Sequence, residues 1–358
     1  MLSLHILHRA VIILKDYSTT AANKLWKGRI YLLTGDVDKT FVLKPAGKMP
    51  IADRFLLIKA YGAGFWCDMD HVVGGLLFAE IAGRIPVVYW GKNSIYGGSD
   101  DINAFEQFFL PVSEYTVHDL IRKDYTVCPE MWNVNNLISE EAQQFIRTGW
   151  YPPDMLLARP EEVLVIGSAP LYQIQPWLQH PHPAFGAGPE DIYRYIFAKY
   201  IKVQPYIVRE LEGFYAANMK NRHNLAVHVR GSDKITEVRL LHQINKLYHA
   251  EIANYLVHNP SASIFLLTES ELILEEYKHL YKERLIITDC QRTGGDDPIY
   301  FKEAADKKRM GIEVLQDVYL AINCDSFIGN AHSNVSNAIV RLKRWPTGSS
   351  KLFSLNDI

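Results

Sequence analysis

The stretch Leu225-Ala-Val-His-Val-Arg-Gly-Ser-Asp-Lys234 decides the fold class of this chain. Its apolar start is typical of a buried strand, and its polar end indicates a turn before a long helical pattern. Further along, the patterns alternate in this order: helix 238–258, strand 263–267, helix 271–282, strand 285–287, helix 311–323, strand 326–328 and helix 333–343. This alternation predicts a parallel, doubly wound α/β sheet, in which ligands bind at the carboxyl ends of the strands.

The first half contains a second unit of the same kind. A strand pattern over 55–61 is followed by the turn Gly62-Ala-Gly64, a helical pattern from Asp68 to Gly83 and a strand pattern over 85–90. Asp68 is a suitable N-cap, and Gly83 is a suitable residue to end the helix. We therefore expect two Rossmann-like α/β domains that face a cleft, an N-terminal one over 1–200 and a C-terminal nucleotide-binding one over 201–358.

The composition excludes several classes of protein. Of the 358 residues, 48% are hydrophobic and 22% are charged, which is ordinary for a globular chain. The 38 basic and 40 acidic residues leave a net charge of −2, so the chain has no bulk attraction to nucleic acid or to an anionic membrane. No apolar window is long enough for a membrane span, so we expect a cytoplasmic protein; a luminal protein cut away from its anchor would look the same.

Charged residues follow the predicted strand at 225–229. Arg230 supplies a fixed cation with several N–H donors, and Lys234 adds a second positive charge, which together suit a diphosphate. The alternative for Arg230 is an ion pair with Asp233 or another carboxylate. Glu237 lies within reach of the same strand end and is a candidate general base for a hydroxyl nucleophile, but the helix dipole also favours an acidic residue in a first helical turn.

A second polar cluster follows the predicted strand at 326–328. The Gly329-Asn330 turn leads to a helix that starts near Ser333, where backbone amides and a serine hydroxyl form a phosphate cradle. The alternative is an N-cap serine that binds no ligand. Asp317, on the preceding helical pattern, belongs to the same cluster.

In their order and spacing, these signals resemble a known family. The segment 224–340 is similar to the nucleotide-binding half of the α1,6-fucosyltransferases, which include the rhizobial nodulation fucosyltransferases, and more loosely to the O-fucosyltransferases. The matching motifs are His228-Val-Arg230, Asp233-Lys234, Thr236-Glu237, Leu266-Leu-Thr268-Glu269, Asp317 and Ser333-Asn-Val335. In the first half, Gly62-Ala-Gly64-Phe-Trp-Cys67 and His71-Val-Val73 are similar to the family's glycine-rich turn and His-Val helix.

The resemblance implies a GT-B-like glycosyltransferase that inverts the anomeric centre, uses GDP-fucose as the donor substrate and a glycan as the acceptor, and needs no metal or other cofactor. It implies that His228 and Asp317 contact the nucleobase and that Arg230 and Ser333 contact the diphosphate. The residues that it places at the site are Glu237, Arg230 and Lys234 for catalysis; His228, Arg230, Thr268, Glu269, Asp317, Ser333 and Asn334 for donor binding; and Gly62, Gly64 and His71 for the acceptor or the turn.

Two departures from the family bear on the identity of the donor substrate. The family commonly has Arg-Arg after His-Val, whereas Gly231 follows Arg230 here and removes a cation that would face the diphosphate. Asn334 stands where a glutamine is usual. A UDP-sugar as donor, or a non-catalytic protein of the same fold that binds a glycan or a nucleotide, therefore stays open as an alternative.

Acidic pairs and aromatic residues give weaker signals. Asp36-Val-Asp38 and Asp68-Met-Asp70 have the D-x-D form used by metal-dependent glycosyltransferases. Short acidic patterns are common by chance, and Asp68 already has a predicted N-cap role, so we expect no metal site. Aromatic residues gather between Trp90 and Phe109, and we expect them to pack in the core rather than to stack on a sugar.

Overall fold

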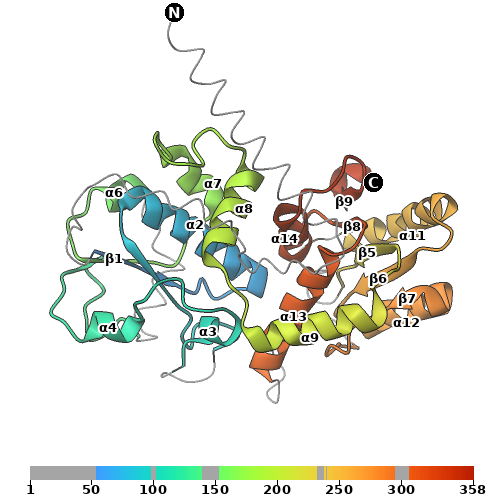
Figure 1. Ribbon diagram of the computed structural model, residues 1–358, viewed down its shortest axis with the longest axis horizontal. Coiled ribbons are helices and arrows are strands. Elements are labelled where there is room, and N and C mark those ends of the chain that lie inside the picture. Colours follow the sequence, from blue (N-terminus) through green and yellow to red (C-terminus); the bar gives the residue numbers. More distant parts are fainter. Residues whose placement is uncertain (1–53, 98–101, 139–152, 232–237, 239, 295–305) are drawn as a thin grey trace, which may run out of the picture.

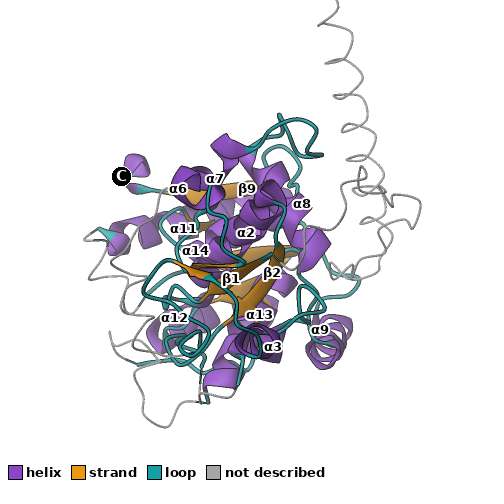
Figure 2. Ribbon diagram, turned by 90° about the vertical axis from the view of Figure 1, so that its left-hand side faces the viewer, coloured by secondary structure: helices purple, strands orange, loops and turns teal. Residues whose placement is uncertain are grey.

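Two parallel β-sheets, each flanked by helices, form the protein (Figures 1 and 2). The computed structural model describes residues 54–97, 102–138, 153–231, 238, 240–294 and 306–358. All strand pairs recorded in the two sheets are parallel. This is the α/β architecture with two Rossmann-like units that the strand and helix patterns predict.

The first sheet has the strand order β2–β1–β4–β3. Its strands are β1 (Phe55–Lys59), β2 (Ile85–Tyr89), β3 (Val127–Cys128) and β4 (Val163–Ile166). The helices and the 3₁₀ turn in this half of the chain are α2 (Phe65–Ala82), α3 (Ala104–Phe108), α4 (Val117–Ile121), α6 (Pro153–Leu157), α7 (Leu171–Ile174), η1 (Gln175–Trp177), α8 (Pro189–Tyr200) and α9 (Pro205–Asn218).

Helix α2 begins earlier than the sequence pattern predicts. Its N-cap is Gly64, so the prediction that Asp68 caps the helix is wrong. Asp68 instead lies buried in the first turn, where its Oδ1 accepts a hydrogen bond of 3.0 Å from the amide of Ala63. The end of the helix is as predicted, because Gly83 follows it with a φ of 61°, a left-handed conformation that glycine adopts readily.

The second sheet has the strand order β7–β6–β5–β8–β9. Its strands are β5 (Asn224–His228), β6 (Ser263–Leu267), β7 (Leu285–Ile286), β8 (Ser326–Asn330) and β9 (Ser350–Phe353). Its helices and 3₁₀ turns are α11 (Leu241–His258), α12 (Glu271–Tyr281), η2 (Lys282–Arg284), α13 (Lys307–Ala321), α14 (Asn334–Leu342) and η4 (Leu355–Asp357).

The two sheets share one apolar core. Because side chains alternate along a strand, Leu56 and Ile58 of β1 point to the shared core, whereas Phe55 and Leu57 point to a smaller core on the opposite face. The second sheet likewise turns Ala226 to the shared core, while α11 and α12 cover its other face. Helices α2, α8, α13 and α14 contact one another between the sheets.

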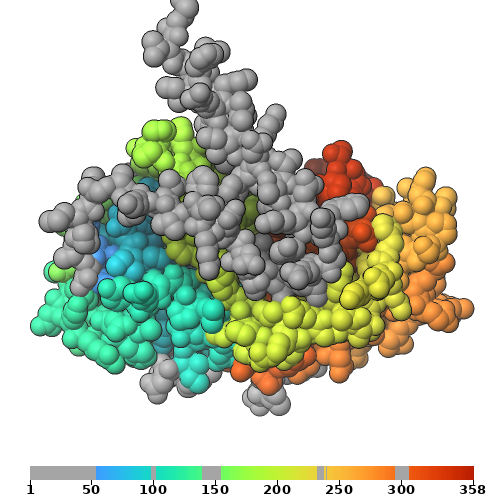
Figure 3. Space-filling view, viewed as in Figure 1, coloured from blue at the N-terminus to red at the C-terminus, as the bar shows by residue number. Residues whose placement is uncertain are grey.

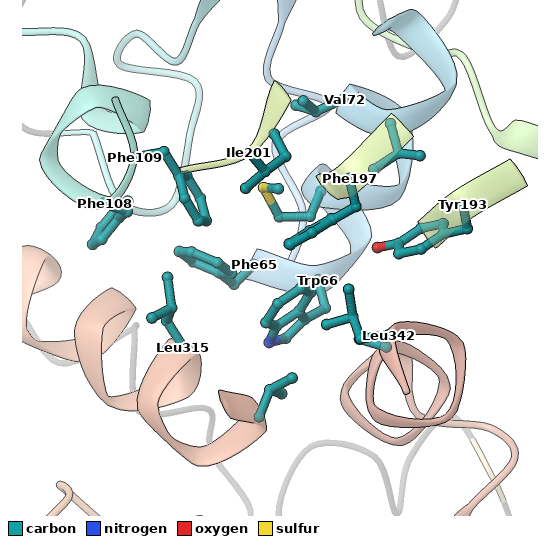
Figure 4. Packing of buried hydrophobic residues seen from close by; sticks show 14 of the residues in the cluster. Phe65, Trp66, Val72, Phe108, Phe109, Tyr193, Phe197, Ile201, Leu315 and Leu342 are labelled. Atoms are coloured by element: carbon teal, nitrogen blue, oxygen red, sulfur yellow. The ribbon is translucent and has the colours of Figure 1, made fainter. Parts of the chain in front are cut away.

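Aromatic side chains fill this shared core. Figure 4 shows the side chains of Phe65 and Trp66 of α2 surrounded by Phe108, Phe197 and Leu315, from three other helices. The rings of Phe65 and Phe108 meet edge to face with centroids 5.1 Å apart. The predicted aromatic cluster is buried here, since the five residues that define it are at most 5% exposed: Trp90, Tyr96, Phe105, Phe108 and Phe109. The prediction that they form core is confirmed.

Helices α8 and α9 carry the chain from the first sheet to the second. Helix α8 contacts both α2 and α14, and α9 runs beside α13 along one side of the molecule (Figures 1 and 3). A domain boundary at residue 200 falls between these two helices and stays a prediction. In the described part of the chain, no helix has the length and apolar character needed to cross a membrane.

Candidate functional site

His228 is the last residue of β5, at the carboxyl edge of the second sheet. Its side chain is buried, and its Nδ1 lies 2.7 Å from the hydroxyl of Ser336 in α14. Its carbonyl accepts a hydrogen bond of 2.9 Å from the Tyr248 hydroxyl in α11. Burial lowers the pKa of His228 to about 4, so the ring is neutral at pH 7 and serves as a hydrogen-bonding group rather than a cation.

Arg230 follows β5 and pairs with Glu269, which follows β6. Arg230 Nη1 lies 3.0 Å from Glu269 Oε1, and the same oxygen accepts a hydrogen bond of 2.9 Å from the amide of Gly231. Burial alone would raise the pKa of Glu269, but Arg230 and these backbone bonds hold it below its ordinary value. Since a guanidinium has five N–H donors, pairing with one carboxylate is compatible with binding an anion as well.

Gly231 lies against the start of α12. A Cβ at this position would lie 3.0 Å from Ser270 Cβ and 3.0 Å from Ile273 Cδ1. Ser270 is the N-cap of α12, and its side chain accepts a hydrogen bond from the amide of Ile273. The close approach of the strand end to this helix therefore favours glycine at a position where the family that the sequence resembles commonly has a second arginine.

Asp317 lies on α13 and carries a half-buried carboxyl group beside the same edge. Its Oδ1 accepts a hydrogen bond of 2.9 Å from the hydroxyl of Thr288, which follows β7. Burial raises the pKa of Asp317 to about 7, and the negative charges of Glu313 and Glu269 act in the same direction. Thr268, at the end of β6, is buried, and its hydroxyl accepts a hydrogen bond from the amide of Ser270.

The turn between β8 and α14 completes this edge. Ser333 is the N-cap of α14, is 5% exposed and makes no side-chain capping bond. Asn330 is buried; its amide donates to the hydroxyl of Ser336, and its Oδ1 accepts from the amide of His332. Asn334 is exposed on the first turn of α14.

The structure thus brings the described members of the predicted donor site to one edge of one sheet: His228, Arg230, Thr268, Glu269, Asp317, Ser333 and Asn334. Thr288 and Ser336 also belong to this edge, and the sequence patterns do not predict them there. Ser336 contacts a residue 108 positions away in the sequence, and Thr288 contacts one 29 positions away, so no local pattern could reveal these contacts.

In the first half, Gly62 and His71 shape the turn after β1. Gly62 has a φ of 85°, and a Cβ there would lie 2.9 Å from the carbonyl oxygen of Asn93. His71 Nδ1 accepts a hydrogen bond of 2.9 Å from the amide of Ala169, and the His71 ring stacks on Tyr61 with centroids 4.3 Å apart. Burial lowers the pKa of His71 to about 4. Gly64 is the N-cap of α2, so these three residues organise the turn, and a contact with the acceptor stays a prediction.

Several predicted site residues lie outside the described residues. These are Lys234 and Glu237, together with Asp233, Thr236 and the acidic pair Asp36 and Asp38. Of the second acidic pair, Asp68 accepts from the Ala63 amide, and Asp70 forms an ion pair of 2.6 Å with Arg341. Within the described ranges, no group of three or more His, Cys, Asp and Glu side chains could hold a metal ion.

No family model matches this sequence, and no curated protein matches it. Among solved structures, the NodZ alpha-1,6-fucosyltransferase soaked with GDP-fucose matches with a TM-score of 0.55 and 19% identity, over 81% of this chain and 92% of that one. NodZ from Bradyrhizobium matches with a TM-score of 0.54 and 20% identity, over 80% of this chain and 92% of that one. POFUT1 in complex with GDP matches with a TM-score of 0.50 and 14% identity, over 85% and 99%. The chain therefore has the GT-B fold of these fucosyltransferases, which confirms the fold that the sequence resemblance implies.

Proposed function

We propose that the protein is an inverting glycosyltransferase that transfers fucose from GDP-fucose to a glycan hydroxyl. The observation that carries this proposal is the convergence of a cation, a neutral histidine, a half-buried carboxyl group and a helix N-terminus at one carboxyl edge, which suits a sugar nucleotide. Solved structures with this fold hold GDP and GDP-fucose, which supports GDP-fucose as the donor substrate.

In this proposal, Arg230 and the start of α14 stabilise the departing diphosphate. Transfer of a sugar builds negative charge on the diphosphate as its bond to the anomeric carbon breaks. Glu269 holds the Arg230 guanidinium through the 3.0 Å ion pair, so the cation is positioned before the reaction starts. Ser333 adds a hydroxyl and the backbone amides of a helix N-terminus. Fixed groups of this kind stabilise a developing charge without reorganisation, and they need no metal ion to do so.

The nucleobase lies, in this proposal, near His228 and Asp317. His228 is buried and Asp317 is half-buried, and neither needs to carry a full charge at neutral pH because desolvation moves both pKa values toward the neutral form. A site built to hydrogen-bond particular groups of its ligand rejects a ligand that lacks them, because its buried polar groups are then left unpaired. Glu237 accepts the proton of the attacking hydroxyl, and Lys234 lies near the sugar; both roles rest on the sequence resemblance.

The choice of nucleotide is tested by thermal-shift titration with GDP, UDP, ADP and CMP, with and without EDTA. A ligand that binds the folded state raises the melting temperature by mass action. The proposal expects stabilisation by GDP that is insensitive to EDTA and weaker in Arg230→Ala. Selective stabilisation by UDP would favour the UDP-sugar alternative that Gly231 leaves open. No stabilisation by any of the four nucleotides would contradict the proposal.

Transfer itself is tested with GDP-fucose and an array of glycan acceptors. Glu237→Gln should abolish transfer and retain GDP binding, because the amide cannot accept the proton of the acceptor hydroxyl. Glu275→Gln, at an exposed position of α12, is the matched control and should transfer at the wild-type rate. A wild-type protein that binds GDP and transfers to no acceptor of the array would support a non-catalytic nucleotide-binding function.

A further inference from the structure

The turn between β8 and α14 contains buried nitrogen atoms without hydrogen-bond partners. Asn330 is 0% exposed, and its Oδ1 accepts a hydrogen bond of 2.8 Å from the amide of His332, so the carboxamide lies within the turn. Asn330 Nδ2 and His332 Nε2 are both buried, and neither has a partner among the described residues. A buried polar group without a partner costs about 1–3 kcal/mol, so a pair of them in one turn points to a bound ligand.

These nitrogen atoms lie beside the end of β5. Strands β8 and β5 are parallel neighbours, with Val227 paired to Ile328, so the residues that follow the two strands share one edge. Ser336 joins them directly, because its hydroxyl accepts from the amide of Asn330 and lies 2.7 Å from His228 Nδ1. The same turn leads into α14, whose N-cap hydroxyl makes no capping bond.

The chemistry of the turn suits an anion. Asn330 Nδ2 is an N–H donor, and His332 Nε2 is a donor in one neutral tautomer and in the protonated ring. They stand next to the N-terminus of α14, where the helix dipole is positive. The nearby carboxylates are already engaged, Glu269 with Arg230 and Asp317 with Thr288. The group that satisfies both nitrogen atoms is therefore expected to carry acceptor oxygens and negative charge.

We propose that Asn330 Nδ2 and His332 Nε2 bind the phosphate next to the sugar in the nucleotide donor. This inference rests on the proposed function and adds two residues to its diphosphate site. Gly231 places no cation after Arg230, and the two N–H groups of the turn supply donors from the end of the neighbouring strand β8 instead. Because such donors are neutral, the affinity for diphosphate should depend less on salt than it would with a second arginine.

The test measures binding to variants of the turn by calorimetry, with GDP, guanosine and inorganic pyrophosphate as probes. His332→Leu removes the N–H donor, whereas His332→Gln keeps one at a similar reach. We expect the Kd for GDP to rise about tenfold in His332→Leu and Asn330→Ala, the size expected for loss of one charge-assisted hydrogen bond. The Kd for guanosine should not change, and His332→Gln should stay within about threefold of wild type for GDP. His279→Leu, at an exposed position of α12, is the matched control.

The proposal that the turn binds phosphate would be overturned by an unchanged Kd for GDP in His332→Leu. An equal loss of affinity for guanosine and GDP in that variant would also overturn it. If Asn330→Ala unfolds, the Leu and Gln variants of His332 still test whether the turn binds phosphate. Pyrophosphate binding separates the two proposals. A wild type that binds pyrophosphate, but binds GDP no more tightly, would contradict the proposed function. Loss of pyrophosphate binding in His332→Leu would then still support a phosphate site at the turn. A wild type that binds neither compound overturns both.

Discussion

The carboxyl edges of the two sheets use their positive charges differently. At the first sheet, Lys59 ends β1 and is 0% exposed; its ammonium donates to the carbonyl of Leu137 and lies 4.4 Å from the ring centroid of Trp132. At the second sheet, the Arg230 side chain is 24% exposed and pairs with Glu269. One edge covers its cation with its own chain, and the other keeps its cation within reach of a ligand. A charge at a strand end therefore indicates a site only where the fold leaves it accessible.

Removing the accessible cation is expected to have the largest effect. Arg230→Ala should lower the rate of sugar transfer by about 10²–10³, since it removes a fixed donor to the departing diphosphate. It also removes the Arg230 cation from beside Glu269, which is largely buried, and this loss should lower the free energy of unfolding by about 3 kcal/mol. The measurements are transfer kinetics and denaturant unfolding.

The double variant Arg230→Ala/Glu269→Gln separates these two effects. It should recover most of the lost stability, because a neutral amide at this position does not need the Arg230 cation, and recover none of the rate. Recovery of the transfer rate in the double variant would show that Arg230 acts only by neutralising Glu269.

The half-buried acid of the second edge should make stability depend on pH. Burial raises the pKa of Asp317 from 3.8 to about 7, so between these values the folded protein holds a proton that the unfolded chain has lost. The free energy of unfolding should then fall as pH rises from about 4 to about 7, by a few kcal/mol, roughly 1.4 kcal/mol per unit at the steepest point. Asp317→Asn should remove this slope in denaturant unfolding at pH 5 and pH 8. The exposed Asp289→Asn is the control, and an unchanged slope in Asp317→Asn would contradict the assignment.

The buried cation of the first edge should give a slope of the opposite sign. Burial lowers the pKa of Lys59 to about 7 from 10.5, so in this window the unfolded chain binds a proton that the folded protein does not. The free energy of unfolding should rise with pH between about 7 and about 10, and the Trp132 ring, which favours the charged amine, should moderate the rise. Lys59→Met should flatten the curve and leave GDP binding unchanged. A loss of GDP affinity in this variant would mean that the first edge also contributes to the nucleotide site.

The smallest expected effect concerns the space beside Arg230. Gly231→Ala places a Cβ 3.0 Å from side-chain atoms of both Ser270 and Ile273, which must move by a few tenths of an ångström, at a cost of about 1 kcal/mol in the free energy of unfolding. Gly213→Ala is the matched control, because nothing lies within 4 Å of its Cβ and it lies inside α9. This control should be stabilised by up to about 1 kcal/mol. Equal changes in the two variants would contradict the proposed crowding at Gly231.

The sequence predicts the second sheet better than the first, for a physical reason. Its central strands are short apolar runs followed by polar turns, and its helices α11, α12 and α14 bury one side only, so the strand and helix periods are both visible in the sequence. Helix α2 is buried along most of its length, so its sequence has no polar side that marks where the helix begins. The pattern predicts a start at Asp68, whereas the helix starts at Phe65. Strand β3 has only two residues, and β9 includes the exposed Lys351, so neither gave a strand signal.

In the candidate site, too, the sequence predicts some features and not others. Arg230 and Ser333 stand directly after strands, and their positions follow from the topology of a parallel sheet. The sequence allows Asp233 or another carboxylate as a partner of Arg230, and among the described residues Glu269, 39 residues further on, pairs with it. The contacts of His228 with Ser336 and of Asp317 with Thr288 also join separate elements. Such partners depend on which strands become neighbours, and no local pattern encodes that.

Amide hydrogen exchange with and without GDP tests the central claim, that the nucleotide binds at the carboxyl edge of the second sheet. The account predicts slower exchange in the segments 229–231 and 330–334 when GDP is present, and unchanged exchange at 60–64 and 91–97, beside the first edge. Slower exchange only beside the first edge, or no change in either region at saturating GDP, would contradict it.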